Sequence, residues 1–184
     1  SRNFSFINVT AEGNDTNGGF DIRDSNSDFS FTNVTASGHA TGGGIEIDAV
    51  NDNFTFTNVV ASGNDSGAGI DIAGDGNTNF VFTNITATGN DTGGGFWIEG
   101  DNNLNFTFVN VTASGDDTGA GIWVSGENNS GFSFTNLVVD GDDTGGGLSV
   151  EDNNSNFSFV NVTSTADGRE SVTIGDNNTN FNFT

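Results

Sequence analysis

Acidic and aromatic side chains recur at a fixed spacing along this chain. Asp21, Glu46 and Asp71 are separated by 25 residues, and Trp97 and Trp123 continue the series at intervals of 26. Carboxylates in a row can bind cations or take part in acid–base chemistry. Exposed aromatic rings are enriched at partner contacts and can stack on sugars. The series is therefore a candidate interface or ligand face.

Catalysis is the weaker interpretation of this series. Acid-based cleavage of a polysaccharide would need basic groups beside the carboxylates, and only Arg23 lies near them in the sequence. The chain has no cysteine, and its single histidine, His39, has no plausible serine and aspartate partners. We therefore expect no catalytic residues, no enzyme activity and a solvated acidic face.

A second acidic series follows the corner glycine in five of the seven repeats. It comprises Asp15, Asp65, Asp91, Asp117 and Asp143, and in two repeats an aspartate also precedes it. Asp116, Asp117, Asp142 and Asp143 would then place four carboxylates on adjacent repeats, and their repulsion could be relieved by Ca²⁺ or by diffuse counterions. With Asp91 these four are the candidate calcium ligands. The motif Gly-Gly-x-Gly-x-Asp is absent, so both alternatives remain open.

Composition limits the partners. The formal charge is −22, with three arginines and no lysine, which disfavours nucleic acid and anionic membranes as partners. No apolar run approaches the ~20 residues of a membrane span, so we expect no membrane insertion. Residue 1 is Ser and no signal peptide is visible, so we expect a processed form or fragment. We expect an extracellular or cell-surface location.

The elements that position these side chains follow from an internal repeat. A Phe-x-Phe pair recurs every 24 to 26 residues, which is the period of a solenoid. The pairs are Phe4/Phe6, Phe29/Phe31, Phe54/Phe56, Phe80/Phe82, Phe106/Phe108, Phe132/Phe134, Phe157/Phe159 and Phe181/Phe183. Residues 1–184 would form one domain, with coils beginning near 4, 29, 54, 80, 106, 132 and 157 and a partial coil at 181–184.

Each repeat contains three short alternating stretches. In the fourth they are Phe80-x-Phe82, Ile85-x-Ala87 and Phe96-x-Ile98, and such alternation predicts half-buried strands. Asn84 and the segment 89–93 separate them with residues that tolerate left-handed backbone. We therefore predict an all-β parallel β-helix with three short strands per coil and about seven coils of 24–26 residues.

An invariant asparagine predicts a ladder along the first corner. Its side-chain amides would hydrogen-bond from coil to coil. The column comprises Asn8, Asn33, Asn58, Asn84, Asn110, Asn136 and Asn161.

Two motifs of the repeat resemble those of a known family. The segments Phe31-Thr32-Asn33-Val34-Thr35-Ala36 and Gly42-Gly43-Gly44-Ile45 are similar to repeats of right-handed parallel β-helix proteins, which include pectate-lyase-like enzymes, phage tailspikes and bacterial surface passengers. The occurrence of these two motifs in one repeat is especially similar to the polymorphic outer-membrane-protein repeat. The resemblance implies right-handed coiling but no activity, because these motifs specify fold and no catalytic motif matches.

Two surface features suggest further roles. Asn-x-Ser/Thr sequons predict glycosylation if the chain is secreted. The candidate sites are Asn3, Asn14, Asn53, Asn64, Asn90, Asn105, Asn128, Asn153, Asn156 and Asn177. Outward Thr-x-Thr pairs such as Thr55/Thr57 resemble ice-binding solenoids, although valines interrupt the rows.

The two ends suggest self-association. Phe4, Phe6, Phe181 and Phe183 would lie in ordinary, uncapped coils and expose apolar stacks and open strand edges. We expect a structural extracellular protein, a head-to-tail subunit of a surface filament, sheath or adhesive fibre. The alternatives are a polysaccharide-binding or -cleaving β-helix, an ice binder, and a segment of a longer solenoid.

Overall fold

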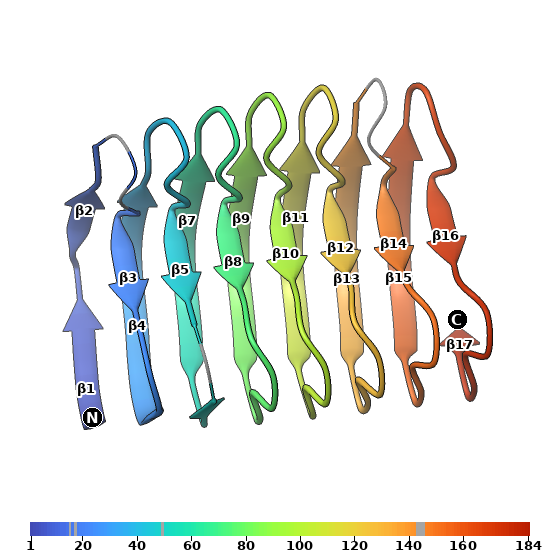
Figure 1. The fold of residues 1–184 in the computed structure, drawn as a ribbon, viewed down its shortest axis with the longest axis horizontal. Helices are drawn as coiled ribbons and strands as arrows, with labels where there is room; N and C mark the ends of the chain where they lie inside the picture. The colour runs from blue at the N-terminus through green and yellow to red at the C-terminus, as the bar shows by residue number, and fades with distance from the viewer. Residues whose placement is uncertain (15, 17, 49, 143–145) are drawn as a thin grey trace.

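The chain forms an all-β parallel solenoid of about seven turns (Figure 1). This architecture is seen in a computed structural model that describes residues 1–14, 16, 18–48, 50–142 and 146–184. Two parallel sheets face each other across the core, and every strand pairs with its equivalent in the next coil. The predicted fold class is therefore confirmed.

The larger sheet, here called the long-strand sheet, contains most of each coil. Its strands, in spatial order, are β1 (Arg2–Ile7), β4 (Asn26–Ser37), β7 (Thr55–Gly63), β9 (Val81–Gly89), β11 (Thr107–Gly115), β13 (Ser133–Gly141), β15 (Ser158–Ala166) and β17 (Asn182–Phe183). Two short strands, β2 (Thr10–Glu12) and β6 (Asn51–Asp52), also pair with β4.

The opposite sheet, here called the short-strand sheet, has one three-residue strand per coil. Its members are β3 (Phe20–Ile22), β5 (Ile45–Ile47), β8 (Ile70–Ile72), β10 (Phe96–Ile98), β12 (Ile122–Val124), β14 (Leu148–Val150) and β16 (Val172–Ile174). In Figure 1 the long strands run upward at the back and the short strands run downward in front, while the coils advance from left to right. The coiling is therefore right-handed.

The three predicted stretches are present in each coil, and from the second coil onward the first two form one continuous strand. In β9 that strand bends at Asn84, whose φ of 56° lies in the left-handed region. The bend turns both Thr83 and Asn84 outward between the buried Phe82 and Ile85. No helix occurs among the described residues, and none that could span a membrane is found there.

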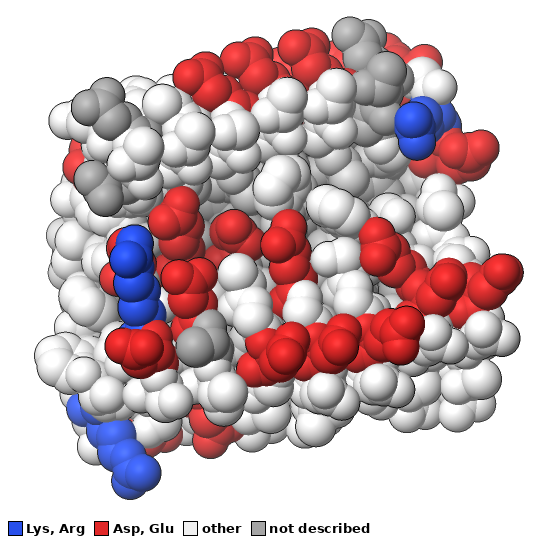
Figure 2. All heavy atoms as spheres, viewed as in Figure 1, with Lys and Arg blue, Asp and Glu red and all other residues white. Residues whose placement is uncertain are grey.

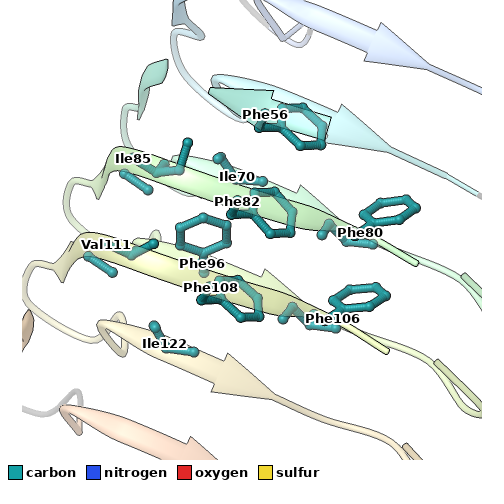
Figure 3. Packing of buried hydrophobic residues seen from close by; sticks show 14 of the residues in the cluster. Phe56, Ile70, Phe80, Phe82, Ile85, Phe96, Phe106, Phe108, Val111 and Ile122 are labelled. Atoms are coloured by element: carbon teal, nitrogen blue, oxygen red, sulfur yellow. The ribbon is translucent and has the colours of Figure 1, made fainter. Parts of the chain in front are cut away.

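Stacks of like side chains fill the core (Figure 3). Phe80 and Phe106 stack with ring centroids 4.8 Å apart and planes at 3°, and Phe82 and Phe108 do so at 4.9 Å. These distances equal the spacing of hydrogen-bonded strands, so each ring lies directly over the ring of the neighbouring coil. Phe96 of the short-strand sheet meets Phe82 edge-on at 5.3 Å, which joins the two walls.

The predicted asparagine ladder is also present. The Asn84 side-chain amide donates to the Asn58 carbonyl oxygen at 2.9 Å, and Asn110 donates to Asn84 at 3.1 Å. The same bond connects the other described members of the column. Each amide within the column both donates and accepts a hydrogen bond, so the ladder links successive coils along this exposed corner.

A second asparagine ladder was not recognised in the sequence. It lies inside the turn that precedes the Phe pair, and Asn51, Asn77, Asn103, Asn129 and Asn154 are all at most 1% exposed. The Asn103 side-chain oxygen accepts the backbone N–H of Asn77 at 2.8 Å, and its amide donates to the Gly100 carbonyl at 3.1 Å. The available signal was an asparagine three residues before each Phe pair from the second coil onward.

We predict that Asn103→Ala lowers the free energy of unfolding by roughly 2–4 kcal/mol, because it leaves a buried N–H and a buried carbonyl without partners. The exposed Asn182 of β17 provides the control, and Asn182→Ala should change stability by less than about 0.5 kcal/mol. Urea unfolding followed by circular dichroism measures both. Equal losses in the two variants would contradict a structural role for the buried ladder.

Candidate functional site

One column of outward side chains runs along the short-strand sheet. Strand pairing aligns its members one above another, and we call them the outer column. They are Asp21, Glu46, Asp71, Trp97, Trp123, Ser149 and Thr173. Each lies between two inward residues of its strand, so the alternation in the sequence predicted this arrangement.

Glycines at the neighbouring corner make room for the column. The Glu46 carboxylate accepts the backbone N–H of Gly43 at 2.7 Å. The Trp97 indole covers Gly94, where a Cβ atom would collide with the ring. The column therefore folds back over the corner, which leaves Glu46, Trp97 and Trp123 half-buried rather than fully exposed.

The two tryptophans form one wall of a hollow. Their ring centroids are 5.8 Å apart and their planes meet at 87°, an edge-to-face contact. The hollow has a volume of about 360 Å³, and its lining includes Trp97, Trp123, Ser149, Arg169 and Glu170. Arg169 and Glu170 come from the seventh coil, where the sequence departs from the usual glycine-rich corner. Aromatic surface, hydroxyl groups and charged groups thus line one hollow.

The two indole N–H groups differ in their partners. Trp123 Nε1 donates to the Glu151 carboxylate at 3.0 Å. Trp97 Nε1 is buried and has no hydrogen-bond partner among the residues that the structure describes. An unsatisfied buried donor costs about 1–3 kcal/mol. Trp97 therefore holds its position through packing and not through a polar contact.

The acidic half of the outer column contains perturbed carboxyl groups. Arg23 pairs with Asp21 at 2.6 Å. Burial raises the pKa of Glu46, although the Gly43 N–H opposes the rise. Burial, followed by the negative charges of Glu99, Glu46 and Asp48, raises the pKa of Asp71 to about 7. One carboxylate oxygen of Asp71 is buried, and no hydrogen bond to it is found within the described part of the chain.

Acidic residues cover much of this side of the molecule. Figure 2, which looks onto the short-strand sheet, shows them across the face and in a continuous band below it, with few basic groups between them. Such a face repels anionic ligands and attracts cations in solution.

The second acidic column lies in the corner that joins each long strand to the next short strand, a few residues before the glycines beneath the outer column. Burial, the neighbouring Asp65 and the charges of Asp117 and Asp116 raise the pKa of Asp91. Asp15 and Asp143 lie outside the described residues. Within the described part of the chain, no three acidic or histidine side chains come together as a group that could hold a metal ion.

The candidate glycosylation sites divide into two sets. The amides of Asn53, Asn64, Asn90, Asn105 and Asn156 donate hydrogen bonds to the preceding coil. Glycan attachment there would remove these bonds. The other five have no side-chain hydrogen bond within the described chain and are exposed or half-exposed, with Asn3 in β1 and the other four in loops between strands. These are Asn3, Asn14, Asn128, Asn153 and Asn177.

Comparison of the chain with protein-family models, curated proteins and solved structures gives no match. Inferences about the function of this site are therefore drawn from its geometry.

We predict that the stability of the protein falls as pH rises from about 4 to about 7. The folded-state pKa of Asp71 is raised to about 7 from its ordinary value of 3.8, so the folded state binds the proton more tightly than the unfolded state does. Burial favours the neutral, protonated carboxyl group, and ionising it in the folded protein costs on the order of 4 kcal/mol.

Asp71→Asn should flatten this pH dependence and stabilise the protein at pH 8, as measured by thermal melting. Asp75→Asn, at an exposed carboxyl group of the next turn, is the control. A wild-type slope that persists in Asp71→Asn would show that another group is responsible.

Proposed function

We propose that the chain is a structural protein, a rigid subunit of an extracellular filament, sheath or adhesive fibre that grows head to tail. The observation behind the proposal is the contrast between the interior and the ends of the Phe stacks. Phe54, Phe80 and Phe106 are fully buried, whereas Phe4 is 49% and Phe183 is 51% exposed. Exposed rings at both ends of a continuous stack favour the addition of further coils.

Open strand edges accompany these rings. At one end β1 and β3 pair on one side only, and at the other end β16 and β17 do the same. Unpaired N–H and carbonyl groups on an edge strand are a template for pairing with another chain. The two ends are different surfaces of one molecule, so contact between them propagates into a filament without closing.

The remaining features suit this role. We propose a non-catalytic protein whose acidic exterior maintains solubility in salt, with cations such as Ca²⁺ near Asp91, Asp116, Asp117 and Asp142. We also propose that the repeats are related to the right-handed pectate-lyase-like solenoids, in particular to surface-passenger repeats. On a secreted chain, Asn3, Asn14, Asn128, Asn153 and Asn177 are the proposed glycosylation sites.

Charges at both ends should stop longitudinal growth. Phe4→Asp combined with Phe183→Asp places carboxylates where rings would stack, and we expect the critical concentration for assembly to rise at least tenfold. The control is Leu104→Asp, a partly exposed apolar residue on the side of the rod. Negative-stain electron microscopy and light scattering measure filament length and mass. Wild-type protein that remains monomeric at high concentration and high salt would rule out the filament.

The hollow beside the tryptophans favours a second candidate function, polysaccharide binding. Trp97 and Trp123 present aromatic surface, and Ser149 and Thr173 contribute hydroxyl groups on the same wall. The negative charge of this face favours neutral sugars over acidic ones.

Trp123→Ala should weaken binding of a neutral glycan at least tenfold, because it removes the stacking surface. Wild-type binding is first measured by tryptophan fluorescence titration with neutral and uronic-acid oligosaccharides. The binding of each variant is then compared by isothermal titration calorimetry. Val138→Ala, on the opposite sheet, is the control. An absence of binding to every oligosaccharide tested would leave the hollow as a packing feature of the rod.

A further inference from the structure

The middle of the outer face of the long-strand sheet carries no charge, and charged residues of this sheet, such as Glu12 and Asp140, lie in columns beside it. The three columns of outward residues beside the Asn8 ladder contain none of the 25 acidic residues and none of the three arginines. We call these columns the uncharged strip. They are Ser5, Ser30, Thr55, Val81, Thr107, Ser133 and Ser158; Ile7, Thr32, Thr57, Thr83, Val109, Thr135 and Val160; and Thr10, Thr35, Val60, Thr86, Thr112, Val138 and Thr163.

The strip is solvent-accessible along the whole rod. Every member is exposed or half-exposed, and Val60 and Val138 expose nearly half of their surface. Fifteen of its members are serine or threonine and the other six are valine or isoleucine. The strip therefore presents rows of hydroxyl and methyl groups in a protein whose formal charge is −22.

From this distribution we propose that the uncharged strip binds the same strip of a second copy, so that rods associate side by side. The inference concerns a different surface from the two ends and holds whether or not the ends stack. Two properties of the strip, its periodicity and its lack of charge, favour a second copy as the partner.

Periodicity favours a second copy because both surfaces repeat at the same distance. The rise per coil is given by the stacked rings, at 4.8 Å for Phe80 and Phe106 and 4.7 Å for Phe106 and Phe132. A contact made between one pair of coils is therefore repeated at the next pair. A partner of another fold would match one or two coils and then fall out of step.

Charge favours the same partner and the same face. Two copies of this acidic protein repel each other in most orientations. When the strips meet, the carboxylates of the outer column lie on the far sides of the two rods, because that column belongs to the opposite sheet. Packed sheets lie about 10 Å apart and the Debye length at physiological salt is about 8 Å, so salt screens the remaining repulsion.

Cysteine cross-linking tests the proposal directly, since the chain has no cysteine of its own. Thr83→Cys places one thiol in the strip, and Ser149→Cys places one in the outer column as the matched control. Under mild oxidation we expect a covalent dimer from Thr83→Cys at least tenfold faster than from Ser149→Cys. Equal rates, or faster dimer formation by Ser149→Cys, would overturn the proposal.

Charge substitution provides a second test in solution. Thr57→Asp with Thr83→Asp should weaken side-by-side association at least tenfold in analytical ultracentrifugation, and added salt should restore part of it. Two controls, Thr57→Asn with Thr83→Asn and Ser149→Asp with Thr173→Asp, should change it by less than about threefold. Circular dichroism verifies that each variant is folded.

Three results would overturn the proposal. The first is equal weakening by the Asp pair and by either control. The second is lateral association that is lost in Phe4→Asp with Phe183→Asp, since this would place the contact at the ends. The third is monomeric wild-type rods that show thermal hysteresis, with the hysteresis lost in the Asp pair, since the strip would then bind ice.

Discussion

The structure depends on the register of hydrogen bonds between successive coils. Each strand pairs with its equivalent one coil away, so every residue lies over the residue that occupies the same place in the repeat. A spacing of about 4.8 Å then applies to the backbone and to all side-chain columns together. A side chain in the core or in a corner ladder must therefore pack against its counterpart in the next coil at this distance. Flat phenylalanine rings and planar asparagine amides satisfy that condition.

The same constraint produces both the core and the surface. Inside, Phe, Ile, Val and Ala form continuous columns without large gaps, because neighbouring coils supply identical shapes. Outside, each position becomes a row, so one favourable or unfavourable interaction is repeated along the rod. An acidic residue that recurs in each coil forms an acidic row, and an outward threonine that recurs forms a row of hydroxyl and methyl groups. Such a molecule presents rows of like side chains to its surroundings.

Departures from repetition are therefore informative. The outer column begins with Asp21, Glu46 and Asp71 and continues with Trp97 and Trp123, which changes the chemistry of one face halfway along the rod. In the seventh coil Arg169 and Glu170 replace the small corner residues and help form the hollow beside the tryptophans. The side chains at these positions occupy space over the corner that glycines leave open, so their identity can change without disturbing the core stacks. The opposite sheet keeps its uncharged rows throughout.

Much of this architecture could be predicted from the sequence, because each local pattern occurs again in every repeat and is therefore easy to recognise. The Phe pairs determined the coil length, the alternation determined which side chains point inward, and Asn84 marked a corner that needs left-handed backbone. The buried ladder through Asn103 was harder to predict, because a polar residue beside a turn is usually exposed and only the fold encloses it.

Tertiary structure alone decided the properties that depend on distance and burial. It half-buries Trp97 over Gly94, buries an oxygen of Asp71 without a partner among the described residues and raises the pKa of that carboxyl group. It also joins the first two predicted strands into one. Spacing in a sequence establishes which residues share a column. How deeply a side chain lies depends on the atoms that close around it, and those atoms come from other coils.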